Sequence, residues 1–157
     1  MEWMTLLATV LGAAIAMGST VLVEVRKDRR EAIGEWRRSK RDLYGAYLGA
    51  LSQVRGELAL IILDRAVPDA ERVLIARQKF AGCYELRYQL EVLAPGAVVD
   101  PALTYFRSVR RLRDATGAGV AHGDEECERV FREVMDALAQ VQAAMRLDLG
   151  TDALATG

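Results

Sequence analysis

An uncharged apolar run near the N-terminus constrains this chain more than any other feature. Residues 3–23 contain no Asp, Glu, Lys, Arg or His. A helix of 21 residues is about 31 Å long, which matches the hydrocarbon thickness of a bilayer. Trp3 lies at one end of the run, where aromatic residues meet the membrane–water interface, and Glu24 marks the other end. The sequence therefore predicts a transmembrane anchor over residues 1–25.

A cleaved secretory signal peptide is the main alternative for this segment. Signal peptides begin with Lys or Arg, whereas only Met1 and Glu2 precede the run here. The tripeptide at residues 14–16, Ala-Ile-Ala, resembles a cleavage site. Whether the segment is ever cleaved therefore stays open at this point.

The distribution of basic residues predicts the orientation of the anchor. No Lys or Arg precedes the anchor, and many follow it in a predicted basic stalk helix over residues 26–39. The positive-inside rule then places the N-terminus outside and the C-terminal domain in the cytoplasm, in a single-pass protein of the cell inner membrane. Six of these basic side chains are candidates for contact with lipid head groups: Arg26, Lys27, Arg29, Arg30, Arg37 and Arg38.

Small residues recur every four positions within the predicted anchor. Ala8, Gly12 and Ala16 form a small-xxx-small stripe, which lets two helix backbones approach closely in lipid. The stripe predicts self-association into a homo-oligomer, although Ala and Gly are also common in membrane helices that make no such contact.

Downstream, apolar residues recur at intervals of three and four, which is typical of amphipathic helices. Three prolines and several glycines divide residues 40–150 into four helical segments, of which the first continues from the anchor to about Arg65. The second runs from Pro68 to about Ala94, and the third starts at Asp100 as N-cap with Pro101 in the first helical position. The fourth runs from the acidic stretch at residues 124–126 to about residue 150.

These segments predict an all-α fold. We expect the transmembrane helix to continue into an antiparallel up-down four-helix bundle over residues 40–150, with a disordered tail at residues 151–157. Gly45 and Gly49 are four residues apart, so they predict a close helix crossing.

No motif in the sequence indicates catalysis, phosphate binding or metal binding. There is no G-x-G-x-x-G, no P-loop, no G-x-S-x-G and no Glu-x-x-His. His122 is the only histidine, and its spacing to Asp124, Glu126 and Cys127 matches no known ligand pattern. We therefore expect a protein that is not an enzyme and has no cofactor or bound metal. The net charge of −1 gives no reason to expect nucleic acid as a partner.

Both cysteines lie inside helical patterns and form no metal-binding spacing. In the cytoplasm, Cys83 and Cys127 are expected to be free, buried thiols.

The first third of the chain resembles a loose group of small membrane-anchored proteins of high-GC bacteria. The shared features are the apolar start, the Arg-rich stretch and an LY-x-x-YL helix, which is Leu43 to Leu48 in this sequence. The resemblance implies an anchor followed by a helical domain, and it transfers no activity or site.

Three functions are compatible with this sequence. The favoured one is a membrane-anchored, non-enzymatic protein-interaction module: a scaffold, adaptor or regulatory subunit that presents the bundle to an unidentified protein partner. A membrane-acting effector, such as a pore-former or toxin-like component, would oligomerise through its transmembrane helix. A small-ligand sensor would hold its ligand in a pocket of the bundle, where Gly45, Gly49 and Cys83 leave room.

Overall fold

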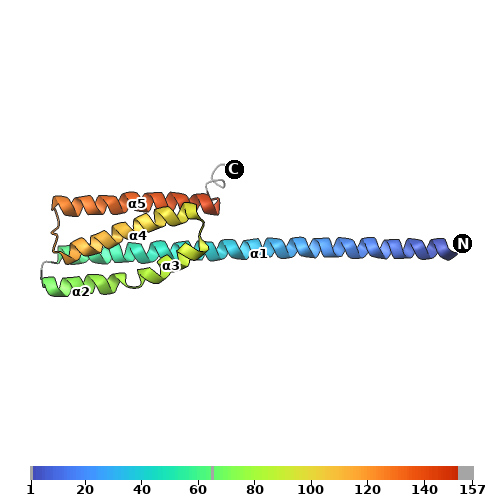
Figure 1. Ribbon diagram of the computed structural model, residues 1–157, viewed down its shortest axis with the longest axis horizontal. Coiled ribbons are helices and arrows are strands. Elements are labelled where there is room, and N and C mark those ends of the chain that lie inside the picture. The colour runs from blue at the N-terminus through green and yellow to red at the C-terminus, as the bar shows by residue number, and fades with distance from the viewer. Residues whose placement is uncertain (1, 65, 152–157) are drawn as a thin grey trace. The chain divides into compact units, whose positions relative to one another are not determined.

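The described part of the chain is helical (Figure 1). The computed structural model describes the backbone of residues 2–64 and 66–151, and the side chains of residues 31, 33–64, 66–68 and 70–151. Its helices are α1 (Glu2–Leu63), α2 (Asp69–Phe80), α3 (Cys83–Leu93), α4 (Gly96–Gly117) and α5 (Glu125–Leu149). Neither residues 2–64 nor residues 66–151 contain a strand. The prediction of an all-helical chain with one long apolar N-terminal helix is confirmed.

The chain divides into two compact units. The N-terminal unit is Met1–Ser39 and the C-terminal unit is Lys40–Gly157. Helix α1 contributes residues to both units, because it crosses the boundary between Ser39 and Lys40. The predicted anchor side chains, and residues 152–157 of the predicted disordered tail, lie outside the described residues.

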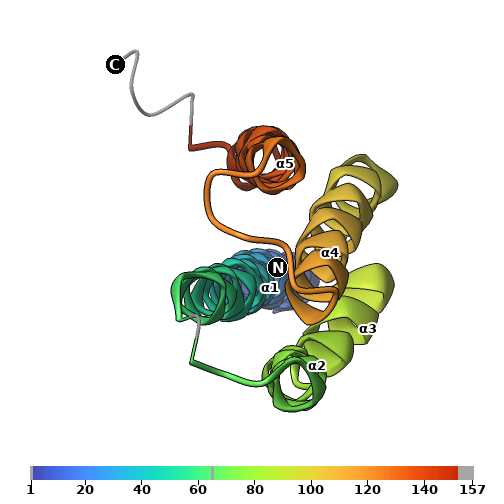
Figure 2. The same ribbon diagram turned by 90° about the vertical axis from the view of Figure 1, so that its left-hand side faces the viewer.

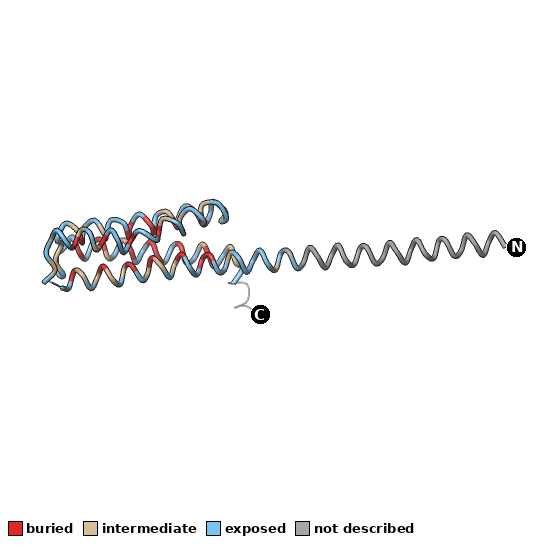
Figure 3. The backbone as a smooth tube through the Cα atoms, turned by 90° about the horizontal axis from the view of Figure 1, so that it is seen from below, coloured by how far each residue is buried: buried red, intermediate tan, exposed pale blue. Residues whose placement is uncertain are grey.

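In the C-terminal unit, α4 lies between α5 on one side and α2 with α3 on the other (Figure 2). The part of α1 that belongs to this unit faces α4. Across this contact the Tyr47 hydroxyl donates a hydrogen bond of 2.7 Å to the carbonyl oxygen of Ala102 in α4. The buried residues therefore gather between the helices (Figure 3).

Helix α1 buries one continuous stripe of side chains in this core. The spacing of threes and fours found in the sequence is the reason, because such residues share one face of a helix. The buried members of the stripe are Leu43, Tyr44, Tyr47, Leu51, Val54, Leu58 and Ile62.

Helix α1 also contains a segment that is long and apolar enough to cross a membrane. By length and composition this segment is Ile33–Leu63, within the residues whose side chains are described. The same segment supplies the buried stripe of the C-terminal unit, and core helices of soluble proteins share this composition.

The predicted second helix is divided in two. Helix α2 ends at Phe80 and α3 begins at Cys83, with Ala81 and Gly82 between them. At this break the backbone forms short-range bonds, from Ala81 N–H to Gln78 O at 3.3 Å and from Tyr84 N–H to Ala81 O at 3.4 Å. Such i to i−3 bonds tighten the turn, and Gly82 has low helix propensity, so the chain bends here while it buries both Phe80 and Cys83.

The predicted start of the third helix was wrong. Helix α4 begins at Gly96, with Pro95 as its extended N-cap residue, so Pro101 lies inside the helix. Val98 and Val99 N–H groups both bond to the Pro95 carbonyl oxygen, at 2.8 and 3.0 Å. The missing N–H of Pro101 costs one bond near the helix start, whereas the extra turn buries Val98 completely.

The predicted bounds of the last helix are confirmed. Asp124 is the N-cap residue of α5, and Gly150 ends the helix with φ of +67°. Gly150 N–H bonds to Leu147 O and Thr151 N–H bonds to Arg146 O, both at 3.1 Å. This pattern is a Schellman motif, and its left-handed position favours glycine.

Candidate functional site

The exposed residues of α1 from Gly45 to Leu63 form a surface without a charged residue, and the two charged residues in this range, Arg55 and Glu57, are partly buried. We call this surface the outer face of α1. Leu60 and Leu63 in this surface are 66% and 56% exposed. By contrast, the exposed face of α5 carries charged residues such as Glu128, Arg129 and Arg132. The exposed residues of the outer face are Gly45, Ala46, Gly49, Gln53, Gly56, Leu60 and Leu63. Exposed helix faces usually carry charged residues, so this surface is suited to contact another molecule.

The close helix crossing predicted at Gly45 and Gly49 does not occur within the described chain. Both glycines are exposed, and a Cβ atom added to either would meet no atom within 4 Å. The same holds for Gly56. The reason is that α1 turns its large side chains toward the core and leaves its glycines outside, where they open the surface.

A groove of about 600 Å³ runs between α1 and α5. We call it the α1–α5 groove. Its apolar lining includes Leu48, Met145 and Leu149, and two exposed arginines, Arg41 and Arg146, also line it. The remaining lining residues are Tyr44, Gly45, Ala139, Gln142, Ala143 and Thr151. Gly45 therefore borders open space that Ala139 and Ala143 leave free on the other helix.

An ion pair and a hydrogen bond connect the two helices that form this groove. Lys40 Nζ lies 3.0 Å from Asp148 Oδ2, and the Tyr44 hydroxyl donates to the same oxygen at 2.8 Å. These contacts connect the first turn of the C-terminal unit to the last turn of α5. A partly buried ion pair with an added hydrogen bond fixes the geometry of this end of the groove.

A second groove, of about 540 Å³, lies between α1 and the break that separates α2 from α3. Gly82 and Cys83 line it together with Glu57 and Lys79, which lie 3.5 Å apart as an ion pair. Burial raises the pKa of the Cys83 thiol to about 11, so this cysteine is a poor nucleophile near neutral pH. The predicted sensor positions are thus separated, with Gly45 at one groove and Cys83 at the other.

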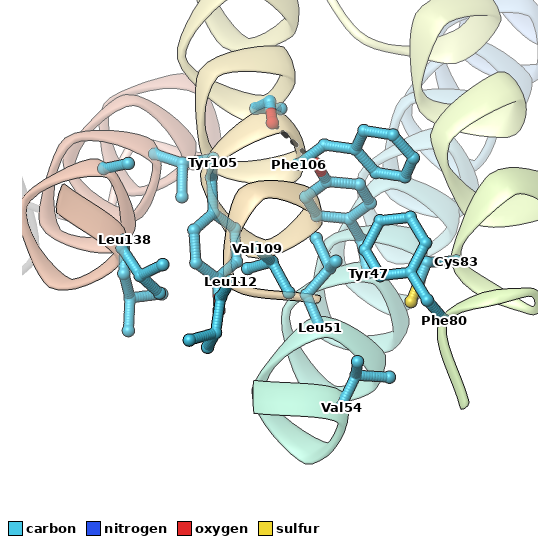
Figure 4. Close-up of a cluster of buried hydrophobic side chains, with 14 of the residues drawn as sticks. Tyr47, Leu51, Val54, Phe80, Cys83, Tyr105, Phe106, Val109, Leu112 and Leu138 are labelled. Carbon is cyan, nitrogen blue, oxygen red and sulfur yellow. Dashed lines mark hydrogen bonds between the residues drawn. The ribbon is translucent and has the colours of Figure 1, made fainter. Parts of the chain in front are cut away.

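The buried tyrosine hydroxyls of the core have partners, which is typical of packing (Figure 4). Among the described side chains, the buried Nε of Arg72 has no hydrogen-bond partner. Besides the Tyr47 bond, Ser52 Oγ and the Tyr105 hydroxyl lie 3.4 Å apart. Phe80 packs against Phe106 with ring centroids 5.0 Å apart, and the Arg113 guanidinium stacks over Phe80 at 4.9 Å.

The structure does not bring the other sequence candidates into one site. His122 is exposed in the loop before α5, and no group of three His, Cys, Asp or Glu residues among the described side chains is placed to hold a metal ion. Cys83 and Cys127 are both free and buried, as predicted. Arg37 and Arg38 are exposed, and the remaining candidates for lipid contact or self-association lie outside the described side chains: Ala8, Gly12, Ala16, Arg26, Lys27, Arg29 and Arg30.

Among the residues of the α1–α5 groove, sequence reasoning gave a site role only to Gly45, and it missed Arg41, Arg146, Ala139 and Ala143 among others. The two alanines recur four positions apart on α5, as Gly45 and Gly49 do on α1. That pairing of small residues becomes a signal only when α1 and α5 are known to be neighbours.

No protein-family model matches the chain, and no curated protein or solved structure matches it either.

Proposed function

We propose that this chain is a membrane-anchored, non-enzymatic interaction module that presents its C-terminal unit in the cytoplasm as a scaffold, adaptor or regulatory subunit. The observation that carries the proposal is the uncharged outer face of α1, which continues over residues 45–63. An uncharged face exposed to solvent does not stabilise a helix, so its presence calls for another explanation. Exposed apolar patches often mark interaction surfaces.

The anchor in this proposal is residues 1–25, which contain the uncharged run at residues 3–23. The later apolar segment, Ile33–Leu63, is less suited to the bilayer because it supplies the core stripe of the C-terminal unit. The basic residues that follow residue 23 orient the anchor with its N-terminus outside the cytoplasm. We further propose that the helices of the C-terminal unit form an antiparallel up-down bundle, in which α2 and α3 together take the place of one helix.

The outer face of α1 suits a protein partner that docks an apolar helix. Gly45, Gly49 and Gly56 allow a partner to approach the helix backbone closely, because they have no side chain. A Cβ atom added to any of them would meet no atom within 4 Å. Leu60 and Leu63 supply apolar area at the end of the face. Burying two leucine side chains contributes roughly 3–6 kcal/mol to association before its entropic costs.

An affinity pulldown of the full chain from detergent-solubilised membranes tests this function. The wild type is expected to enrich a specific protein, and Gly49→Arg is expected to reduce that enrichment at least tenfold. Gln140→Arg is the matched control, because it adds the same charge at an exposed position of α5. A wild-type chain that is recovered without any partner, or equal recovery by both variants, would contradict the proposal.

The α1–α5 groove favours a second candidate, a ligand-binding sensor. The groove combines a volume of about 600 Å³ with an apolar lining and a few polar groups, which is typical of small-molecule sites. Ligands of this site are expected to raise the melting temperature of the full chain in a concentration-dependent manner. Unchanged melting across a set of apolar and amphiphilic ligands would argue against a sensor.

A further inference from the structure

We infer that the partner of the outer face of α1 is a second copy of the same chain, bound through the outer face of its own α1 with the two helices parallel. The inference rests on the proposed interaction module, and it names the partner of that surface.

The exposed residues of the outer face follow the spacing of a coiled-coil seam. From Ala46 to Leu63 they recur at intervals of three, four, three, four and three, and the residues between them are buried or partly buried. Alternating intervals of three and four define the a and d positions of a heptad, which pack together when two helices coil around each other. The a positions are Ala46, Gln53 and Leu60, and the d positions are Gly49, Gly56 and Leu63.

The residue types of this seam suit close packing of two helices. Gly49 and Gly56 have no side chain, and a Cβ added to either would meet no atom within 4 Å, so a second helix can approach the backbone there. Leu60 and Leu63 are both more than half exposed, and a second copy would cover them with its own two leucines. Gln53 is a polar residue at an a position, which in coiled coils fixes the register and the number of helices.

The charges beside the seam favour the parallel arrangement. The acidic residues Glu57 and Asp64 occupy e positions, whereas the g positions hold the uncharged residues Gly45, Ser52 and Ala59. Parallel helices place each e position beside a g position of the other chain, whereas antiparallel helices place the two e sides together. Only the parallel pair therefore keeps the carboxylates of one chain away from those of the other.

The parallel direction also agrees with the proposed anchor. Parallel pairing brings the Lys40 ends of the two C-terminal units to the same end of the pair, which suits two chains anchored in one membrane through residues 1–25. Antiparallel pairing would place these two ends at opposite ends of the pair.

The seam is too small for a stable dimer of detached chains. It contains six residues of each chain, whereas stable interfaces use about 20–30 residues on each side. Asp42 occupies the preceding d position and is exposed and charged, so its two copies repel each other at the start of the seam. Pairing therefore depends on a shared membrane, which raises the local concentration of the second copy.

Disulfide crosslinking of the full chain in membrane vesicles tests the inference, with copper phenanthroline as the oxidant. Gly49→Cys and Gly56→Cys each place a thiol at a d position, and both are expected to form crosslinked dimers. Gln140→Cys is the matched control, because it adds a thiol at an exposed position of α5, and it is expected to crosslink at least tenfold more slowly. The wild type measures any background from Cys83 and Cys127, which are buried.

A charge in the seam is expected to prevent pairing. Leu60→Glu, added to Gly49→Cys, is expected to slow crosslinking at least tenfold. Leu74→Glu makes the same change at an equally exposed leucine of α2 and is expected to leave the rate unchanged. Equal crosslinking of Gly49→Cys and Gln140→Cys would overturn the inference. A disulfide between Ala46→Cys of one copy and Leu63→Cys of another would also overturn it, because parallel helices hold these positions about 25 Å apart.

A second copy and a different protein partner give different results in the pulldown. Recovery of a differently tagged copy of this chain, together with crosslinking at both glycines, supports the inference. Enrichment of a different protein that is lost with Gly49→Arg, without crosslinking at Gly49→Cys, would exclude the second copy and leave the proposed interaction module intact.

Discussion

Single polar groups in the core of the C-terminal unit decide how its helices fit together. The Tyr47 side chain is only 1% exposed, and its hydroxyl reaches a backbone carbonyl of α4 at 2.7 Å. A buried hydroxyl without a partner is unfavourable, so this bond selects one register of α1 against α4.

Tyr47→Phe is expected to lower the free energy of unfolding by about 1 kcal/mol, because it removes one buried hydrogen bond and leaves the packing intact. Urea denaturation of the full chain in detergent micelles, followed by circular dichroism, measures the change. Tyr88→Phe is the matched control, since Tyr88 is 57% exposed, and it is expected to change little. Equal effects of the two substitutions would show that the Ala102 contact contributes nothing to stability.

The buried thiol of Cys83 makes stability depend on pH in the alkaline range. Burial raises its pKa from 9.0 to about 11, so between these values the unfolded chain releases a proton that the native chain retains. Unfolding is therefore favoured as pH rises through this window. Wild-type stability, measured by urea denaturation, is expected to fall more steeply across this window than that of Cys83→Ala.

Cys127→Ala is the comparison for this experiment. Burial and the Asp124 and Glu128 carboxylates also raise the pKa of Cys127, although less strongly, so this variant is expected to retain more of the fall than Cys83→Ala. Identical slopes for wild type and Cys83→Ala would mean that the thiol ionises equally in both states.

At the scale of helices, two glycines near helix ends differ in the sign of their φ angle. Gly150 has φ of +67°, whereas Gly82 has φ of −65°, which any residue adopts. Gly150→Ala is expected to destabilise the protein by about 1 kcal/mol. Gly82→Ala is expected to stabilise it by about 0.5–1 kcal/mol, because alanine restricts the unfolded chain and its Cβ would meet nothing within 4 Å.

Thermal unfolding of both variants in parallel measures this difference in sign. Stabilisation by Gly150→Ala would contradict the Schellman end of α5, and destabilisation by Gly82→Ala would show that the break after α2 requires glycine.

The helix boundaries were predictable where the local signal and the packing agree. For α5, the acidic start after Asp124 and the glycine at residue 150 coincide with the ends of a buried stripe. For α4, the signal of Asp100 and Pro101 is equally strong in the sequence, yet burial of Val98 extends the helix back to Gly96. Gly82 shows the opposite case, because the apolar period continues through a break that depends on how α2 and α3 pack on α4.

The candidate site was less predictable than the helices. Sequence periodicity indicates that α1 buries one face, but it does not separate buried Leu51 from partly buried Ala50 beside it. The outer face is therefore defined only once the structure shows which positions are exposed. The α1–α5 groove depends on which helix lies beside α1, and neither Arg41 nor Arg146 carries that information in the sequence. The sequence singled out Gly45 as a position of close helix contact. Within the described chain it borders open space instead, because a Cβ added there would meet no atom within 4 Å.

At the scale of the whole molecule, the proposed anchor predicts that the chain behaves as an integral membrane protein. Sodium carbonate extraction of membranes is expected to leave the wild-type chain in the pellet. Ala13→Arg combined with Ala14→Arg places two charges near the centre of residues 3–23, and each charge opposes insertion by about 2.5–3.5 kcal/mol. This variant is expected in the supernatant, whereas Ala13→Leu with Ala14→Leu remains in the pellet. Release of the wild-type chain by carbonate would contradict the proposed anchor. That result would not test the fold of the C-terminal unit.

The ion pair between Lys40 and Asp148 brings the two ends of the C-terminal unit close together. It brings together residues 108 positions apart. The first and last helical turns of the C-terminal unit therefore lie next to each other. Domains with adjacent ends tolerate a new peptide linkage between those ends and an opening elsewhere. A circular permutant that links residue 151 to residue 40 and opens at the exposed loop near Gly123 would thus keep the same helices in the same neighbourhood. In the native order, a protein fused after Thr151 would emerge beside the point where the chain arrives from the predicted anchor.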